Sequence, residues 1–335
     1  MNDLKVSIIC GVYNADQYIE KCINSMLNQS YKDIEIILVV NASTDGSVDI
    51  VKKMQNKYSA IIHAYYVEDK LGAGGSRQFG FEHSVGDCIC FVDCDDELAP
   101  DYVLNMVDVM KGSDADIVVC NFKKVDCSGN ILYVRQYKNK FSALVQSVAP
   151  WGKMFRKEYL RKNEMTLRNI PFGEDILFAT EIYMTKPNIE LCDYIGYIWR
   201  DNPQSTSHTE LRGFPQNTFE KSREYFEYIC SKYSEKEKFG NEISYFIYKY
   251  YVWYLLQSGR KEKVSSMRDE YNKIFNYMKE SNLNHKLVFG GGVKGERVIV
   301  RVVLLVIAVM EKLHLSKVFF IFYSQSFLGK FWPSL

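Results

Sequence analysis

Residues 88–100 read "CICFVDCDDELAP", an apolar run that ends in four carboxylates between Asp93 and Glu97. The run at 88–93 has the β-rich, unbroken apolar character of a strand that is buried on both faces. Carboxylates this close together repel one another unless water, a cation or basic side chains compensate their charge. The stretch therefore predicts a buried strand whose carboxyl end needs a partner of opposite charge.

Similar apolar runs alternate with helical patterns through the first 120 residues. We predict strands at 5–10, 34–40, 60–67, 88–93 and 115–122, and helices at 15–29, 46–57, 100–111 and from the glycine loop at 72–75 to about 84. Apolar strands separated by helices favour an α/β fold with a mainly parallel sheet covered on both faces. Ligands bind at the carboxyl ends of the strands in such sheets, where "VVNASTDG", "DKLGAGGSR" and "VDCDDE" all fall.

The chain is less regular from 123 to 210, where we expect short helices near 156–163 and 174–185 and a strand near 191–198. From about 216 to 283 the pattern becomes helical and rich in Tyr, Lys and Glu. The glycine-rich "GGGVKG" then separates a last segment from this helical region.

Charge is distributed unevenly, although the net charge is only +1. The first 120 residues hold 19 acids against 9 bases, and the remaining 215 hold 22 acids against 33 bases. This balance suggests that the first part manages a cation and that the second meets an anion, such as phosphate or a lipid surface. Solvated charge alone is the alternative explanation.

The nine cysteines form no CxxC motif and lie mostly in apolar runs. They are therefore expected to be buried thiols of a reducing cytoplasm. The N-terminal residues lack the apolar stretch of a signal peptide, so we do not expect export.

The last segment, 291–335, is apolar, but its uncharged runs are shorter than the roughly 20 residues that a spanning helix needs. One stripe of its helical wheel is basic: Lys294, Arg297, Arg301, Ala308 and Lys312. With the aromatic residues that follow, this pattern favours a helix that lies in the interface of an anionic membrane. The alternative is a C-terminal helix packed on the protein's own core.

Asp93 and Asp95 point to the same side of an extended chain, because side chains alternate along a strand. They can share a hard cation such as Mg²⁺ or Mn²⁺, which takes one or two carboxylates while phosphate oxygens and water complete its shell. The alternative is a solvated turn whose acids only cap the helix after Pro100. We favour the metal for Asp93 and Asp95, and the helix start for Asp96 and Glu97.

The glycine loop "LGAGGSRQFG" (71–80) is not a dinucleotide fingerprint, because Arg77 stands where the last glycine of G-x-G-x-x-G is needed. A turn that delivers Arg77 from a helix start fits better, since a guanidinium can bind a base carbonyl or a phosphate. The sequence contains no Walker loop, and no spacing of its five histidines suggests a catalytic triad or a metal site.

In order and spacing these motifs resemble those of the family 2 glycosyltransferases, an inverting family with the GT-A fold that builds capsules, lipopolysaccharides and other glycans from nucleotide sugars. "VSIICGVYNADQYIEKCINSMLNQSYKDIEIILVVNASTDGS" resembles the family's opening, and "GSRQFGFEHSVGDCICFVDCDDELAP" resembles its Arg loop and D-x-D. "WGKMFRKEYL" and "PFGEDILF" resemble its acceptor-side elements. The resemblance covers residues 5 to about 210 and implies a GT-A fold, which has a Rossmann-like, mainly parallel sheet.

The resemblance assigns roles on the donor side. Gly11 and Tyr13 would lie against the nucleotide base with Asn41 beside it, Arg77 would reach the base or a phosphate, and Asp93 would contact ribose or a metal-bound water. Two departures from the family pattern concern this side: Gly11 replaces the proline of "PVYN", and Asn41 replaces the second Asp of "DDGS", which accepts from the uracil N–H. An Asn amide accepts through its oxygen but also donates, so UDP is the first choice and another nucleotide is the alternative.

On the reaction side, the resemblance implies that Asp95 binds Mn²⁺ or Mg²⁺ and that Asp175 is the general base for the acceptor hydroxyl. A helix start with first-turn acids is the alternative for Glu174 and Asp175. Acceptor or diphosphate contacts are expected from Trp151, Lys153, Glu174, Arg200 and His208.

We therefore predict a metal-dependent, inverting glycosyltransferase that moves a sugar from a nucleotide-diphosphate donor to a hydroxyl of a glycan or lipid-linked glycan in polysaccharide biosynthesis. We expect no nucleic acid partner, and a cytoplasmic location on the inner face of the cell membrane. The predicted parts are a GT-A domain at 1–215, with a nucleotide-sugar half at 1–120 and an acceptor half at 121–215, a helical region at 216–290, and the membrane-associating segment at 291–335.

Two alternatives to this function stay open. One is a non-catalytic nucleotide-sugar or glycan-binding protein on the same fold. The other is a nucleotidyltransferase on a related sheet, against which the lack of a basic, glycine-rich loop after the first strand argues.

Overall fold

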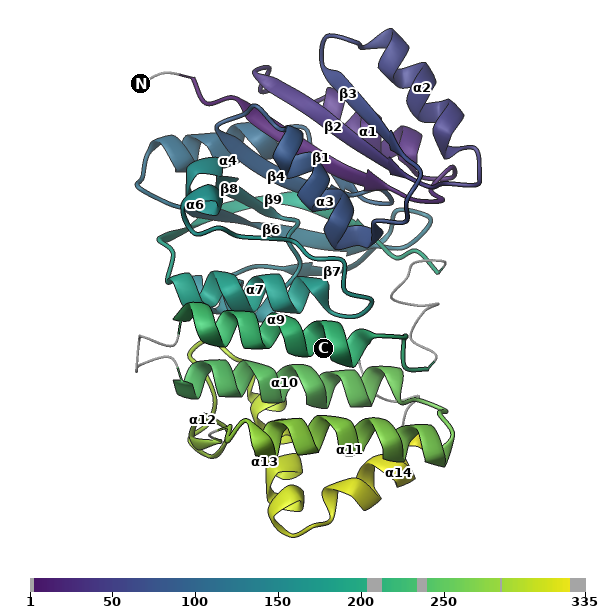
Figure 1. Ribbon diagram of the computed structural model, residues 1–335. Coiled ribbons are helices and arrows are strands. Elements are labelled where there is room, and N and C mark those ends of the chain that lie inside the picture. The colour runs from purple at the N-terminus through teal and green to yellow at the C-terminus, as the bar shows by residue number, and fades with distance from the viewer. Residues whose placement is uncertain (1–2, 204–212, 234–239, 284, 326–335) are drawn as a thin grey trace. The chain divides into compact units, whose positions relative to one another are not determined.

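Figure 1 shows the computed structural model, which describes residues 3–203, 213–233, 240–283 and 285–325. The chain divides into two compact units. The first comprises Met1–Ala143, Ser147–Asn169 and Thr185–Asn202, and the second comprises Leu144–Gln146, Ile170–Met184 and Pro203–Leu335. The first is built on a sheet with flanking helices, and the second is built from helices.

The sheet of the first unit has nine strands in the order β3-β2-β1-β4-β8-β6-β9-β5, with β7 paired to β6. Strands β1 to β9 are Val6–Val12, Ile34–Asn41, Ile62–Val67, Cys88–Asp93, Glu97–Leu98, Ile117–Val125, Ile131–Arg135, Lys153–Arg156 and Ile189–Arg200. Neighbours from β3 to β4 are parallel, as are β6 and β9, whereas β8 runs antiparallel to β4 and β6. The predicted α/β fold with a mainly parallel sheet is confirmed. No pattern predicts β5, β7 and β8, because strands of two to five residues are too short to show a period.

Helices cover both faces of this sheet (Figure 1). They are α1 (Ile19–Leu27), α2 (Ser47–Lys57), α3 (Gly72–His83), α4 (Tyr102–Lys111) and α6 (Lys157–Lys162), while α5 (Lys140–Gln146) is divided between the two units. Val6, Ile8 and Cys10 of β1 share a buried cluster with α1, α2 and α4. On the opposite face α3 lies so close that a Cβ added to Gly80 would be 2.3 Å from the side chain of Ile9.

All nine cysteines are free, and six of them are buried. The buried ones lie in the apolar strands and helices of the first unit, where a thiol packs as a small hydrophobic group. The prediction of free, buried thiols is confirmed for these six, whereas Cys94 and Cys230 are half-buried and Cys127 is exposed.

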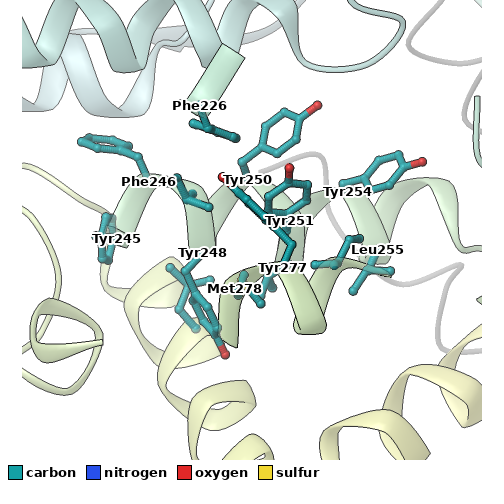
Figure 2. Packing of buried hydrophobic residues seen from close by; sticks show 14 of the residues in the cluster. Phe226, Tyr245, Phe246, Tyr248, Tyr250, Tyr251, Tyr254, Leu255, Tyr277 and Met278 are labelled. Atoms are coloured by element: carbon teal, nitrogen blue, oxygen red, sulfur yellow. The ribbon is translucent and has the colours of Figure 1, made fainter. Parts of the chain in front are cut away.

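The helices of the second unit surround a core that is rich in tyrosine. They are α7 (Glu174–Thr185), α9 (Thr218–Tyr233), α10 (Gly240–Ser258), α11 (Val264–Glu280), α12 (Lys286–Phe289), α13 (Val298–Lys312) and α14 (Ser316–Gln325). α10 lies at its centre, and Figure 2 shows five of its tyrosines, Tyr245, Tyr248, Tyr250, Tyr251 and Tyr254, among the buried side chains. Tyrosine suits this core because the ring packs while the hydroxyl finds a partner: Tyr250 donates to the carbonyl of Phe172 at 2.8 Å, and Tyr254 to Glu270 at 3.0 Å.

None of the helices in the described ranges combines the length and the apolar character that crossing a bilayer requires.

Candidate active site

The carboxyl end of β1 lies in the middle of the sheet, next to the ends of β2 and β4. Gly11 pairs with Asp93 of β4. A Cβ on Gly11 would lie 2.9 Å from the Cβ of Ser76, so glycine at this position lets α3 approach the strand. That approach places the next residue of α3, Arg77, over the strand ends.

Arg77 and Asp93 form a short ion pair, with 2.7 Å between the guanidinium Nη2 and the Asp93 Oδ1. The Arg77 side chain is 9% exposed and that of Asp93 is 33% exposed, so the pair is held at depth but open to solvent on the aspartate side. The family resemblance implies nucleotide contacts for both residues. The structure joins them, so a ligand that meets one lies within reach of the other.

Tyr13 and Asn41 follow at the ends of β1 and β2. The Tyr13 side chain is 42% exposed, and the Lys70 Nζ lies 4.8 Å from its ring centroid. Asn41 is buried, and its Oδ1 accepts a hydrogen bond from the Leu71 N–H at 2.8 Å. Because a backbone N–H can only donate, the Asn41 oxygen faces Leu71. This oxygen has a second lone pair and the NH₂ group donates, so the amide can both accept from and donate to a ligand.

Asp95 follows β4 and is half-buried. Its Oδ2 accepts from the Asn202 Nδ2 at 2.9 Å, and the Tyr18 hydroxyl donates to the Asn202 Oδ1 at 3.2 Å. Burial, and next to it the charge of Asp93, raise the pKa of Asp95 above its usual range. The protein's own groups thus stabilise the ionised Asp95 carboxylate only in part. This is expected of a carboxylate that binds a metal ion supplied with a ligand.

Asp96 and Glu97 do not start a helix, so that expectation from the sequence is wrong. Asp96 is 1% exposed and accepts from the Tyr197 hydroxyl at 2.6 Å and the Arg200 N–H at 2.8 Å. Glu97 lies in β5 and pairs with the Arg200 guanidinium, while α4 begins only at Tyr102. Burial raises the pKa of Asp96 well above the usual range. These two acids join the turn after β4 to β9, which the sequence cannot show because β9 is about 100 residues away.

The donor set of this turn suits a metal ion that arrives with its own ligands. Among the residues that the structure describes, no three His, Cys, Asp or Glu side chains are arranged to hold a metal ion. Asp95 offers one carboxylate whose raised pKa a cation would lower, and neighbouring Asp93 is partly engaged by Arg77. Mg²⁺ and Mn²⁺ often take one or two carboxylates with phosphate oxygens and water. The residues therefore fit a metal–diphosphate, and Asp95 is the carboxylate that would face the ion.

Trp151 lies beside the site but in a supporting position. Its ring stacks on Tyr197 with 4.5 Å between centroids and meets Phe122 edge-on at 5.0 Å. Since the Tyr197 hydroxyl donates to Asp96, Trp151 supports the turn after β4 by packing on Tyr197. Arg200 is similarly tied down by Glu97.

Lys153 is a structural lysine. It is 2% exposed, and its ammonium donates to the carbonyls of Ser147 at 2.8 Å and Ala149 at 2.5 Å. This corrects the expectation of a diphosphate contact, because the charge is used to hold the turn before β8. His208 lies outside the described residues.

Glu174 and Asp175 belong to the second unit and stand in the first turn of α7. Gly173 precedes them with a φ of +68°, and a Cβ there would lie 2.8 Å from the Tyr250 ring. The Asp175 Oδ1 accepts from the Ile176 N–H at 2.8 Å. The packed tyrosine and the left-handed glycine therefore set where the two half-buried acids begin the helix.

Three site residues carry no signal in the sequence: Tyr18, Tyr197 and Asn202. Tyr18 lies in the turn before α1, Tyr197 in β9 and Asn202 in the loop after it, and no residue type or spacing distinguishes them as site residues. They matter because the fold brings Asn202 to Asp95 and Tyr197 to Asp96. Only tertiary contacts reveal such second partners.

With this geometry, comparison with known proteins identifies the family. The profile described as "Glycosyl transferase family 2" matches residues 7–174. The chain therefore belongs to glycosyl transferase family 2, and the predicted resemblance is confirmed.

Relatives agree with this assignment. The chain is 32% identical over 228 residues to glycosyltransferase GlyG of Streptococcus pneumoniae, a match that covers 62% of this chain and 74% of GlyG. It is 27% identical over 224 residues to glycosyltransferase GlyA of the same organism, covering 61% of this chain and 32% of GlyA. It is 28% identical over 226 residues to the poly(ribitol-phosphate) beta-glucosyltransferase of Bacillus spizizenii, a match that covers 64% of this chain and 35% of that protein. The chain thus spans only about a third of the last two proteins.

Solved structures support the fold. S. aureus TarS 1-349, solved in complex with UDP-GlcNAc, aligns with a TM-score of 0.66 and 17% identity, covering 98% of this chain and 92% of that one. The mannosyltransferase PcManGT of Pyrobaculum calidifontis, in complex with GDP-Man and Mn²⁺, aligns with a TM-score of 0.51 and 11% identity, covering 100% and 89%. The GT-A fold is thereby supported over the sheet and the helical region.

Proposed function

We propose that the chain is an inverting glycosyltransferase that moves a sugar from a nucleotide-diphosphate donor, a UDP-sugar in the first place, to a hydroxyl of a glycan or lipid-linked glycan in surface polysaccharide synthesis. The observation that carries this proposal is Asp95, a half-buried carboxyl with a raised pKa at the end of β4, next to the Arg77–Asp93 pair. The names of the relatives support sugar transfer, and the ligands in the two similar structures support a nucleotide sugar.

On the donor side, Tyr13 offers an exposed ring on which a base can stack. The Arg77 guanidinium hydrogen-bonds a base carbonyl or a phosphate, and Asp93 accepts from the ribose. Asn202 orients the Asp95 carboxylate, which would hold Mn²⁺ or Mg²⁺. When bound, such an ion neutralises the charge that develops on the leaving diphosphate.

On the acceptor side, Asp175 is the proposed general base. The acceptor oxygen attacks the anomeric carbon from the side opposite the diphosphate, the bond to the diphosphate oxygen breaks, and the hydroxyl proton passes to the Asp175 carboxylate. The single displacement inverts the configuration of the anomeric carbon. Glu174, Trp151 and Arg200 are proposed to support the acceptor and diphosphate positions.

The amide of Asn41 admits a second candidate for the nucleotide. Its NH₂ group can donate to the ring nitrogen of cytosine, whereas the second lone pair of its oxygen can accept from the ring N–H of uracil. UDP stays the first choice because similar structures carry it. Calorimetry with UDP and CDP, repeated on Asn41→Asp, separates the two: the variant should gain UDP affinity relative to CDP.

We further propose the division of labour expected from the sequence: donor binding by 1–120, acceptor binding by 121–215, a helical region at 216–290, and attachment of 291–335 to the inner face of the cell membrane from the cytoplasm. Partners are then the donor, the acceptor and an anionic lipid surface.

A transfer assay tests the proposal. Nucleotide sugars are screened for hydrolysis or transfer with Mn²⁺, and the active donor is then assayed with Asp95→Asn and Asp175→Asn. Both variants should lose transfer while their circular dichroism stays that of the wild type. Asp101→Asn, which changes an acid on the same loop at the start of α4, serves as the matched control and should stay active.

Near-normal turnover in either variant would overturn the assignment of that residue. Binding of a glycan without any nucleotide binding would instead favour the non-catalytic alternative.

A further inference from the structure

The outward face of α13 is apolar, which is unusual for a helix at the surface of a protein. Apart from Lys312, its exposed positions are all aliphatic: Val298, Ile299, Val302, Leu305, Val306 and Val309. Surface helices normally turn their apolar stripe to the core and their polar stripe to water. α13 does bury a stripe, with Leu304, Ile307 and Ala308 in the core cluster. It therefore presents apolar side chains on two faces, and among the residues that the structure describes only one of these faces packs on the core of the second unit.

Exposed apolar residues are also found beyond α13, in the turn and in α14, the next helix of the chain in Figure 1. Leu313 and Leu315 are exposed in the turn, and Val318 and Phe322 are exposed one helical turn apart on α14. Phe320 and Tyr323, on the other side of α14, are buried in the core. Ten large apolar side chains are thus exposed on α13, the turn and α14, and we refer to them as the strip. Soluble monomers rarely expose large apolar patches.

Basic residues border the strip. Segment 286–325 contains six Lys and Arg residues and two Glu residues. Glu296 is buried and pairs with Lys249 at 2.5 Å, and Glu311 is half-buried with a pKa that burial raises. The exposed charge of this segment is therefore positive.

The basic stripe expected from the sequence lies at the edge of the apolar strip and does not form the outward face. Ala308, a member of that stripe, is 1% exposed, and the Arg301 guanidinium donates to the Val293 carbonyl at 3.1 Å. Arg301 precedes Leu305 by one helical turn and Lys312 follows it by two, so both lie beside the exposed side chains. Lys294 precedes the helix.

We propose that α13 and α14 form a docking surface for an anionic lipid bilayer, in which the ten-residue strip enters the interface and the basic residues at its edge bind the headgroups. Fifteen residues of α13 extend about 22 Å, less than the roughly 30 Å of a hydrocarbon core, so the helix lies in the plane of the interface. The positive charge beside these apolar side chains complements anionic headgroups, which favours an anionic bilayer over an uncharged apolar partner. This surface specifies the membrane attachment in the proposed function, on which it rests, and names the side chains that make it.

Vesicle co-sedimentation of the full chain tests the surface. Vesicles of phosphatidylcholine with phosphatidylglycerol should bind the wild type, and vesicles of phosphatidylcholine alone should bind it weakly. Val302→Asp with Val309→Asp should lower the affinity for anionic vesicles by about tenfold or more, because the strip can then no longer enter the interface. Arg301→Gln with Lys312→Gln should lower it by about fivefold per charge and flatten its dependence on salt.

The matched control lies on β7, an exposed strand of the first unit. Val134 is 43% exposed, as is Val309, so Ile131→Asp with Val134→Asp introduces the same chemistry at equally accessible positions. This control should bind vesicles as the wild type does, and both double variants should keep the wild-type thermal midpoint because all four positions face solvent.

Two results would overturn the proposal. One is unchanged vesicle binding in the Val302→Asp, Val309→Asp variant. The other is a wild-type protein that does not bind vesicles but forms a dimer without lipid, together with a monomeric Val302→Asp, Val309→Asp variant. A second copy of the chain would then cover the strip. Binding is measured without nucleotide sugar, and transfer to a water-soluble acceptor is measured in parallel. Loss of the docking surface and loss of the transferase function are therefore distinguishable.

Discussion

The buried Glu181 of the helical unit and the half-buried Asp95 of the sheet unit have opposite kinds of surroundings. In the helical unit, Glu181 is fully buried, and its oxygens accept from the Tyr225 hydroxyl at 2.6 Å and pair with the Lys232 ammonium at 2.8 Å. In the sheet unit, Asp95 is held by one neutral amide, and its neighbour Asp93 adds like charge.

The same contrast holds elsewhere in the helical unit. Glu296 pairs with Lys249 and accepts from the Tyr245 hydroxyl at 3.2 Å, and Glu270 accepts from Tyr254. The helical unit therefore neutralises these acids with its own side chains, which favours stability. The turn after β4 leaves part of its charge to be met by a ligand, which is typical of a functional site.

The largest effect should come from removing the unmatched charge. Asp95→Asn keeps the shape of the side chain and its contact with Asn202 but takes away the ligand for the cation. We expect the affinity for UDP in the presence of Mn²⁺ to fall by about 10³-fold, because a bound metal contributes several kcal/mol to holding a diphosphate. Calorimetry with and without Mn²⁺ measures this. Metal-dependent binding that survives in the variant would mean that Asp95 is not the ligand.

Removing a matched charge should act on stability instead. Lys232→Met leaves Glu181 buried without its cation, so we expect the free energy of unfolding to fall by about 2–3 kcal/mol in urea titrations. Adding Glu181→Gln should recover more than half of that loss, since the buried charge is then gone. UDP affinity should stay that of the wild type in both variants. A loss of UDP affinity without a loss of stability would contradict the comparison.

The partner of the unmatched acid should have an intermediate effect. Asn202→Ala removes the amide that orients Asp95, and outer residues of this kind typically change metal affinity by about tenfold or more. The expected result is a weaker response of UDP binding to Mn²⁺ with unchanged binding of UDP alone. Asn105→Ala, which removes a surface amide on α4, is the control.

The smallest effect concerns stability at the site itself. Because burial and Asp93 raise the pKa of Asp95, the folded protein holds a proton on it at pH values where the unfolded chain has already lost it. Stability is therefore lost as the pH rises from the usual Asp range through the raised pKa. Asp95→Asn should raise the thermal midpoint of the ligand-free protein at pH 7 by about 1–3 °C, and this gain should disappear below the usual Asp pKa. A lower midpoint at pH 7 would show that the carboxylate is compensated after all.

Much of the sheet could be predicted because its central strands are continuous apolar runs. "VSIIC", "IEIILVV" and "CICFVD" lie in β1, β2 and β4, and the helices between them follow their expected positions within a few residues. The short strands β5 and β8 could not be predicted, and their absence from the expectation explains the error at Asp96 and Glu97. A two-residue strand exists only because β9 pairs with it, so its local sequence carries no signal.

The candidate site shows the same division. Arg77, Asp93 and Asp95 could be chosen from residue type and spacing, because crowded acids after a strand and an arginine at a helix start are local patterns. Lys153 was chosen because it lies in "WGKMFRKEYL", which resembles an acceptor-side element, but its ammonium donates to two backbone carbonyls. Asn202 could not be chosen, since its contact with Asp95 spans more than 100 residues.

By itself, the sequence determined the mainly parallel sheet, its acidic edge, the family, and the excess of positive charge in the later part of the chain, because each of these follows from short-range patterns of residue type. The tertiary structure alone decided which charges have partners and which apolar faces are covered. It pairs Glu181 with Lys232, leaves Asp95 with an amide, and buries one stripe of α13 while exposing the other. The physical reason is that compensation and burial depend on which distant segments meet, and that is a property of the folded chain.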